Sequence, residues 1–279
     1  MQLKTNPNRN SGFMRVQPPP KQIFFSVLFS FYLTGCPRSP IAHPPVAGIE
    51  LARIESDSIL KKLLNKDAAI QSFRGLLNVR AVSDGEVNSF REVIAFRKPG
   101  QLRVEALPLN GFLTLSLLVS DDGALIALDP NSKVAIRSKN SEALIREHLR
   151  LPAEKSDLMS LFSGTIPTRF LSEHRQIKVF SSAIHFTIVV GDFTEYFLVR
   201  SSDLSLEEVQ IRSHFDDSVA VTIHYTPSTK SNLHDLDIDI PKDKTKISLK
   251  WNSATIGGDV PDKLFRAEIP SDYHVIERE

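Results

Sequence analysis

Apolar and polar residues alternate along many short stretches of the chain between residues 71 and 251. Successive side chains of a β-strand point to opposite faces, so this alternation predicts strands with one buried face. Turn-forming groups separate the stretches, for example SDGE at 83–86, KPG at 98–100 and DPNS at 129–132. The expected strands are 71–82, 91–97, 101–106, 112–119, 124–128, 133–137, 176–180, 183–190, 193–200, 205–212, 218–225, 234–240 and 245–251, with a further short strand at 264–268.

Three segments have the spacing of amphipathic helices instead. In 50–66, 141–149 and 155–162, aliphatic residues recur among polar ones at near-helical intervals. A long antiparallel sheet must cover its apolar face with a second sheet or with helices. Because three helices give thin cover for so many strands, we expect a mainly β fold with a few helices: an incomplete, strongly curved antiparallel barrel, lidded by the helices.

Several expected strands carry an apolar face that suits the inside of such a barrel. Two interpretations of this face stay open, a core filled by side chains and the wall of a cavity for a hydrophobic ligand. The candidate cavity-lining residues are Leu113, Leu115, Leu117, Val119, Phe186, Ile188, Val221 and Ile223.

Composition excludes some functions and leaves others without support. A net charge of +1 over 279 residues provides no field that would attract nucleic acid. The single cysteine allows neither an intrachain disulfide nor a cysteine-based metal site. His234 precedes three aspartates at alternate positions, 235, 237 and 239, which is typical of the solvated face of a strand. No catalytic motif is present, so we expect a protein that is not an enzyme and needs no metal or cofactor.

The amino-terminal part of the chain has the composition of an export signal. Residues 1–22 contain basic residues only among their charges, and Ile23–Leu33 is an apolar run too short to span a bilayer, which takes about 20 residues. The string LTGC at 33–36 follows and resembles the bacterial lipobox. This resemblance implies a signal peptide over 1–35, cleavage after Gly35, and lipid on the thiol of Cys36 and on the new amino terminus.

The alternative for this region is a membrane-anchoring or buried helix with a chance cysteine. Four prolines, at 37, 40, 44 and 45, oppose continuation of a helix. We therefore expect residues 36–48 to form a lipidated, proline-rich tether before a domain at 49–279. Two or three acyl chains make such an anchor effectively permanent. By the bacterial sorting pattern, Pro37 in place of Asp implies the periplasm-facing leaflet of the outer membrane. Met14 is an alternative start that leaves the mature product unchanged.

Four segments in the expected domain resemble, in order, the outer-membrane lipoprotein receptor LolB, its periplasmic relative LolA and related bacterial lipoproteins. They are SFRGLLNVR (72–80), QLRVEALPLNGFLTLSLLVSDDGALIAL (101–128), DLMSLFSGTIP (157–167) and TKISLKWNSATI (245–256). The resemblance spans residues 50–255, and the order of elements rather than one motif supports it. The segment after Trp251 extends beyond the usual end of the receptor and looks more like the carrier or the uncharacterised relatives.

The resemblance implies a fold, a ligand and partners. The family fold is an incomplete barrel whose helices lid an apolar cavity for lipoprotein acyl chains. The receptor accepts lipoproteins from a LolA-like periplasmic carrier and places them in the outer membrane, aided by a protruding leucine in a Pro-Leu-Gly loop. Here Pro108, Leu109, Asn110 and Gly111 match that loop with one extra residue, so Leu109 takes the membrane-insertion role. We expect a monomer that meets lipoproteins, the carrier and the membrane.

Two hypotheses follow from the sequence. In the first, the protein is a lipid-anchored receptor that binds acyl chains, of lipoproteins or of another lipid, and helps deliver lipoproteins to the outer membrane. In the second, it is a non-catalytic assembly lipoprotein that uses the curved sheet to dock envelope proteins.

Overall fold

The fold was obtained as a computed structural model, which describes residues 49–50, 53–110, 114–121, 123–149, 155–167, 175–179 and 183–279. The three α-helices in these residues are α1 (Arg53–Ala69), α2 (Ser141–Leu149) and α3 (Lys155–Ser163). All three lie where the apolar spacing predicts helices. Within the described ranges, no helix combines the length and the apolar character that crossing a bilayer requires.

The strands of the described residues form one sheet of fifteen strands. They are β1 (Ile49–Glu50), β2 (Ser72–Ser83), β3 (Glu86–Arg97), β4 (Gln101–Pro108), β5 (Ser116–Asp121), β6 (Ala124–Asp129), β7 (Val134–Ser138), β8 (Arg175–Val179), β9 (Ala183–Val190), β10 (Phe193–Arg200), β11 (Leu206–Ser213), β12 (Val219–Pro227), β13 (His234–Ile240), β14 (Thr245–Ile256) and β15 (His274–Arg278). Each of the thirteen longer strands predicted between residues 71 and 251 has a counterpart here, shifted by a few residues at some ends.

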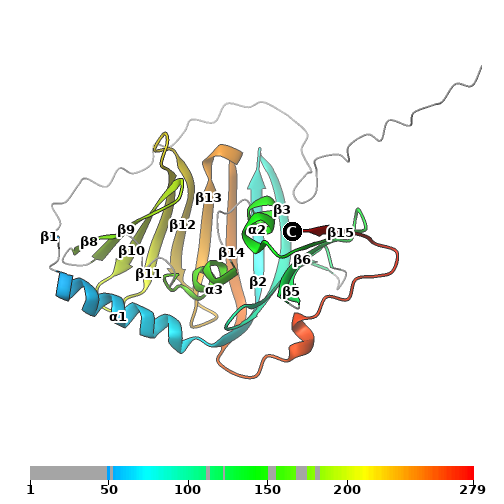
Figure 1. Cartoon of the computed structure of the whole chain (residues 1–279), viewed down its shortest axis with the longest axis horizontal. Helices are drawn as coiled ribbons and strands as arrows, with labels where there is room; N and C mark the ends of the chain where they lie inside the picture. Colours follow the sequence, from blue (N-terminus) through cyan, green and yellow to red (C-terminus); the bar gives the residue numbers. More distant parts are fainter. Residues whose placement is uncertain are drawn as a thin grey trace, which may run out of the picture.

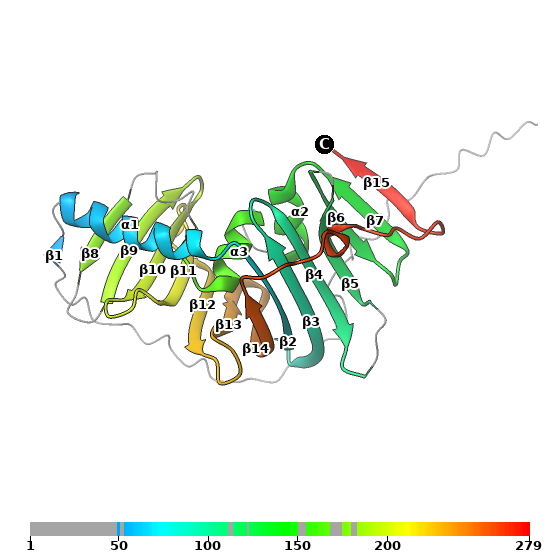
Figure 2. The same cartoon turned by 90° about the horizontal axis from the view of Figure 1, so that it is seen from below.

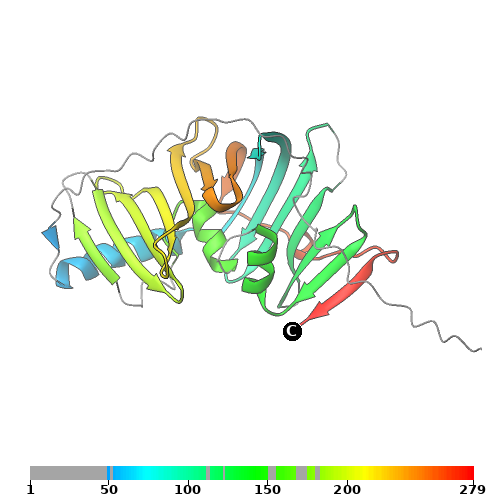
Figure 3. The same cartoon turned by 90° about the horizontal axis from the view of Figure 1, so that it is seen from above.

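The sheet is arched and open. Its order is β1-β8-β9-β10-β11-β12-β13-β14-β2-β3-β4-β5-β6-β7-β15, with β1 and β15 at the two free ends. Neighbouring strands run antiparallel, except that β15 lies parallel to β7. Figure 3 shows the arch, with the helices beneath it. The predicted fold class, an incomplete and strongly curved antiparallel barrel with a helical lid, is confirmed.

The centre of the arch joins the early and late parts of the chain through β2 and β14. Their register shifts between Trp251 and Ser253, which marks a β-bulge. The Trp251 indole packs edge-on against Phe73, 5.4 Å between ring centroids, and donates a hydrogen bond of 2.8 Å to the carbonyl of His234. Gly75 lies under this ring, where an added Cβ would stand only 2.8 Å from the Ser253 carbonyl oxygen. A residue without a side chain is therefore required at position 75.

The concave face holds the main core. Helix α1 extends along the β8–β11 half, while α2 and α3 lie nearer the centre (Figures 1 and 2). Each helix contributes buried side chains to the same apolar cluster as the sheet. These residues are Leu60 and Leu63 of α1, Leu144 and Ile145 of α2, and Leu158, Met159 and Leu161 of α3.

Within the described ranges, the segment after β14 covers one half of the convex face. After β14 the chain crosses β3–β7, forms a short 3-10 helix, η3 (Asp262–Phe265), and ends in β15 (Figure 2). We call residues 257–273 the strap. The short strand predicted at 264–268 is wrong: the apolar residues there pack onto the sheet from outside instead of pairing within it. The pairing of β15 with β7 was not predicted.

Candidate functional site

The concave apolar face, here called the inner wall, brings together four of the predicted cavity residues. Phe186 and Ile188 on β9 and Val221 and Ile223 on β12 are each at most 1% exposed and belong to the main cluster. Val189, next to Ile188 in the sequence, points to the other face and is 44% exposed, as alternation requires. The sequence therefore assigned this half of the inner wall to the correct side of the sheet.

The helices close the inner wall at these positions. Because Ile188 has no exposed surface, its contacts are with other side chains of the cluster rather than with solvent. A hydrophobic ligand reaches this part of the wall only if a helix moves or side chains repack. The filled-core interpretation thus describes these four residues in the conformation seen here.

The β5 residues lie elsewhere. Leu117 and Val119 are buried in a separate cluster with Ile126 and Leu128, packed under Tyr273 and other strap residues on the convex face. Their predicted place on the inner wall is therefore wrong, and Leu118, between them, faces the main core instead. Both faces of this half are buried, so β5 is apolar on both sides and its pattern does not reveal which side points inward.

Two further predicted cavity residues also fail to join the inner wall. Leu115 precedes β5 and is 39% exposed. Leu113 lies outside the described residues, as do the signal segment 1–35 and the tether 36–48 with Cys36.

Leu109 projects from one rim of the sheet. It follows Pro108, which pairs with Phe90 near the start of β3, and it is 49% exposed. Asn110 beside it is also exposed, whereas Gly111 lies outside the described residues. The turns between β2 and β3 and between β13 and β14 share this rim, since Thr245 pairs with Ser83. Exposure fits the membrane-insertion role that the resemblance implies, but that role stays a prediction.

The structure adds a carboxyl to the inner wall that the sequence reasoning missed. Glu92 on β3 shares its face with Ile94 and Phe96, both fully buried, and pairs across to Leu77 and Ala106. Burial raises the pKa of Glu92 to about 7. The side chain nevertheless keeps some exposed surface, so it faces a less tightly packed part of the wall. Its period-two relation to Ile94 and Phe96 was the signal available in the sequence.

A second polar group on the inner wall lacks compensation. The hydroxyl of Tyr225 on β12 is buried and has no hydrogen-bond partner among the described residues. Burial raises the pKa of this phenol above its ordinary value, so it stays protonated at neutral pH. An unpaired buried hydroxyl costs stability and can donate to a polar group that enters the core.

A polar cluster fixes the end of α1 to α3 and to the β3–β4 turn. The buried carboxylate of Asp67 accepts hydrogen bonds from Thr165 Oγ1 at 2.7 Å and Ser160 Oγ at 3.1 Å. Lys98 Nζ donates to the Asp67 carboxylate and to its carbonyl oxygen, each at 2.6 Å. Because all these groups are paired, the cluster holds the two helices together at one side of the inner wall.

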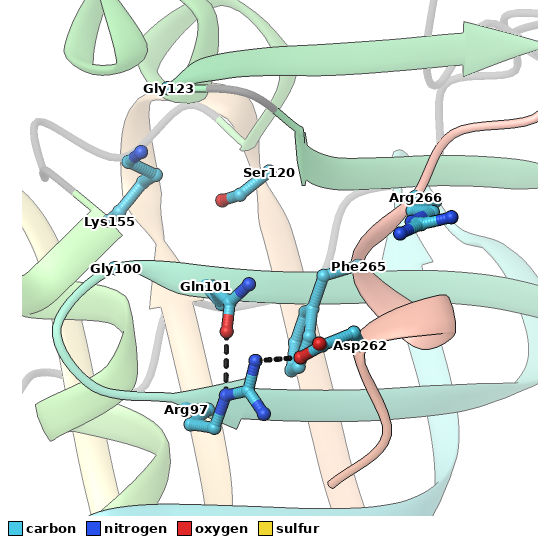
Figure 4. Close-up of a pocket in the computed structure, with 9 residues that line it drawn as sticks. All are labelled: Arg97, Gly100, Gln101, Ser120, Gly123, Lys155, Asp262, Phe265 and Arg266. Carbon is cyan, nitrogen blue, oxygen red and sulfur yellow. Dashed lines mark hydrogen bonds and ion pairs between the residues drawn. The ribbon is translucent and has the colours of Figure 1, made fainter.

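A polar cavity of about 430 Å³ opens at the rim opposite Leu109 (Figure 4). It lies between the strap, the ends of β3–β6 and the start of α3. Its lining residues are Arg97, Gly100, Gln101, Ser120, Gly123, Lys155, Asp262, Phe265 and Arg266. Arg97 pairs with Asp262 and donates to Gln101 Oε1 at 2.7 Å. This pairing holds the Asp262 pKa below its usual range.

The described ranges give little support for metal binding. No group of three or more His, Cys, Asp or Glu residues there is arranged to hold a metal ion. The aspartates after His234 are engaged separately: Asp235 accepts the backbone N–H of Trp251 at 3.0 Å, and Asp239 pairs with Lys246 at 3.3 Å.

Comparisons with known proteins identify the fold. No protein-family model matches the sequence, and no curated protein matches it at a significant level. Among solved structures, a LolA superfamily protein from Nitrosomonas europaea aligns with a TM-score of 0.51 and 15% identity, over 76% of this chain and 97% of that one. A DUF1329 family protein from Desulfovibrio piger aligns with a TM-score of 0.55 and 9% identity, over 77% of this chain and 98% of that one. The chain therefore has the LolA/LolB-like fold.

Proposed function

We propose that the protein is a lipid-anchored lipoprotein that binds acyl chains beneath its helices and helps deliver lipoproteins to the outer membrane. In this proposal Cys36 carries the lipid anchor, the tether gives the domain reach, and the domain faces the periplasm from the inner leaflet of the outer membrane. Binding and transfer require no covalent chemistry, so we further propose that the protein is not an enzyme.

The observation that supports this proposal is the apolar inner wall of an open arch, roofed by three separate helices. An open arch does not fix its own width by closing hydrogen bonds between its end strands, so helices and sheet can separate by repacking side chains. An apolar face that is exposed in this way buries hydrocarbon at about 25 cal/mol per Å². Saturated chains match such a wall because they require few polar partners.

The direct test is whether the domain takes up a lipoprotein. The domain of residues 49–279 is mixed with a LolA-like carrier loaded with a palmitoyl-labelled lipoprotein, and the label on each protein is measured after separation. We expect the label to move to this domain, and native mass spectrometry to find lipid on the protein as purified. If no label is transferred and no bound lipid is found, the proposal is refuted.

A substitution at Leu109 tests the delivery of a lipoprotein separately from its binding. With Leu109→Glu, we expect uptake from the carrier to stay near the wild-type level while release into liposomes falls, because a charged tip resists insertion into lipid. The matched control is Val87→Glu, a similarly exposed aliphatic residue near the same rim, at 52% exposure. Equal loss of uptake and release in Leu109→Glu would argue against a membrane-insertion role.

A further inference from the structure

The charges around the rim cavity of Figure 4 do not balance. Arg97 and Asp262 neutralise each other, and Arg97 also donates to the carbonyl of Val260 at 3.1 Å and lies over the Phe265 ring. Lys155 and Arg266 are the other charged lining residues. In the part of the chain that is described, neither of their side chains has a hydrogen bond or an ion pair. The described residues that line the cavity therefore carry three positive charges and one negative charge, and the carboxylate of Asp262 interacts electrostatically with Arg266 as well as with Arg97.

The two cations stand on opposite sides of the cavity. Lys155 begins α3, Arg266 belongs to the strap, and Ser120 of β5 lies between them in Figure 4. The Ser120 hydroxyl accepts a hydrogen bond of 3.3 Å from the backbone N–H of Leu102, so its own proton can be donated to a ligand. Gln101 uses its oxygen for Arg97, which leaves its amide N–H groups as further donors. The polar groups that remain are thus mainly donors.

A second cavity of about 350 Å³ adjoins the first, because Gly100 and Lys155 line both. Its other charged lining residues, Asp67 and Lys98, pair with each other. Lys155 is again a lining cation, and no ion pair of its side chain is seen among the described residues. Burial lowers the pKa of Lys155, which is the expected effect of partial burial on an ammonium group.

We propose that the rim cavity is a binding site for a phosphate group, held between Lys155 and Arg266 with Ser120 as a neutral donor. A phosphate presents several acceptor oxygens in different directions and so can meet donors from the strap, β5 and α3 at once. Arginine suits this role because its planar guanidinium binds phosphate in a bidentate manner. The phosphate belongs either to a lipid headgroup or to a small soluble molecule, and the site does not depend on acyl-chain binding beneath the helices.

The test is a titration of the full-length protein, purified in a detergent with an uncharged headgroup. The probes are inorganic phosphate, glycerol 3-phosphate, a dioctanoyl phosphatidic acid and the matching neutral diacylglycerol, each followed by calorimetry. The variants are Lys155→Gln, Arg266→Gln and their combination. The control is Lys263→Gln, which removes the same charge from an exposed strap residue that does not line the cavity.

We expect saturable binding of at least one phosphate-bearing probe, a loss of affinity of about tenfold in each single variant, and a larger loss in the double variant. Lys263→Gln should change the affinity less than about twofold. Much tighter binding of the phosphatidic acid than of glycerol 3-phosphate identifies a lipid headgroup as the source, and equal affinities identify a soluble phosphate.

The proposal is overturned if no phosphate-bearing probe binds, if the double variant binds as well as the wild type, or if Lys263→Gln weakens binding equally. All variants alter residues with exposed surface, and an unchanged melting temperature verifies folding. The neutral diacylglycerol separates the two proposals. If the diacylglycerol binds and a phosphate group adds no affinity, acyl-chain binding is supported and the rim site is refuted. If phosphate-bearing probes bind and the diacylglycerol does not, the rim site is supported and acyl-chain binding is refuted.

Discussion

The two halves of the arch are built differently. In the β8–β12 half the sheet has one buried face, and its outward residues, such as Val189 and Tyr196, are exposed by 44% and 36%. In the β3–β7 half both faces are buried, the inner one under the helices and the outer one under the strap. Val119 and Ile126 on that outer face have no exposed surface. The same sheet thus combines a solvent-facing half with a half enclosed on both sides.

The difference shows what a strand pattern can and cannot reveal. Alternation in β9 and β12 identifies the inner wall directly, because water solvates the other side. In β6 every residue of Ala124–Leu128 is buried, so its apolar run indicates burial without indicating direction. The strap causes this burial because it covers the outer face of the sheet, and its role became visible only in the structure.

The largest expected effect comes from placing a charge on the outer face of each half. Val119→Asp should lower the free energy of unfolding by about 4 kcal/mol, because it buries an unpaired carboxylate beneath the strap. Val189→Asp, at an equivalent outward position of the other half, should change it by less than about 0.5 kcal/mol. Urea denaturation of both variants measures the contrast. Similar losses in the two variants would mean that the halves do not differ as described.

Two phenylalanines differ in burial between the strap and the solvent-facing half. Phe265 of the strap is 2% exposed and packs with Val260 and Ala95, whereas Phe215, at the β11–β12 turn, is 81% exposed. Phe265→Ala should cost about 3 kcal/mol and Phe215→Ala less than about 0.5 kcal/mol, measured by thermal unfolding. Hydrogen exchange should also speed up in β15 for Phe265→Ala alone. If the strap contributed little to the stability of the fold, Phe265→Ala would produce neither effect.

Glu92 makes the stability of the enclosed half depend on pH. Its folded-state pKa of about 7 lies above its ordinary value of 4.5, so the protonated form is favoured in the native state. The associated stability is fully present below about pH 4.5 and is lost as pH rises through 7. Relative to wild type, Glu92→Gln should therefore be more stable by about 1 to 3 kcal/mol at pH 8, and nearly equal at pH 4.5. A difference that is constant with pH would show that Glu92 ionises normally.

The smallest effect is expected where β15 is held by surface charge. Arg278 pairs with Glu147 of α2, and both side chains are substantially exposed, at 40% and 48%. Arg278→Ala should lower the free energy of unfolding by no more than about 0.5 kcal/mol, since exposed ion pairs contribute little. A loss above about 2 kcal/mol would show that this pair, and not the apolar contacts of the strap, secures the carboxyl-terminal strand.

Much of the fold could be predicted from local patterns, and less of the site. The helices at 141–149 and 155–162 follow from apolar spacing, and the inward direction of Ile188 and Val221 follows from alternation. By contrast, the parallel pairing of β15 with β7 joins segments more than a hundred residues apart and has no local signal. The rim cavity likewise depends on three distant segments meeting, so Lys155 and Arg266 could not be connected before the structure placed them together.

In the proposed function, acyl chains bind beneath the helices and not on the outer surface of the sheet. Phe193 and Tyr196 test it within one strand, because Phe193 packs against the main core and Tyr196 is exposed on the other face. Each is replaced in turn by the photoreactive residue benzoylphenylalanine, and the protein is irradiated during transfer of a palmitoyl-labelled lipoprotein. We expect label to be captured at position 193 and not at 196. Equal capture at both positions, or none at 193, would show that acyl chains do not bind beneath the helices.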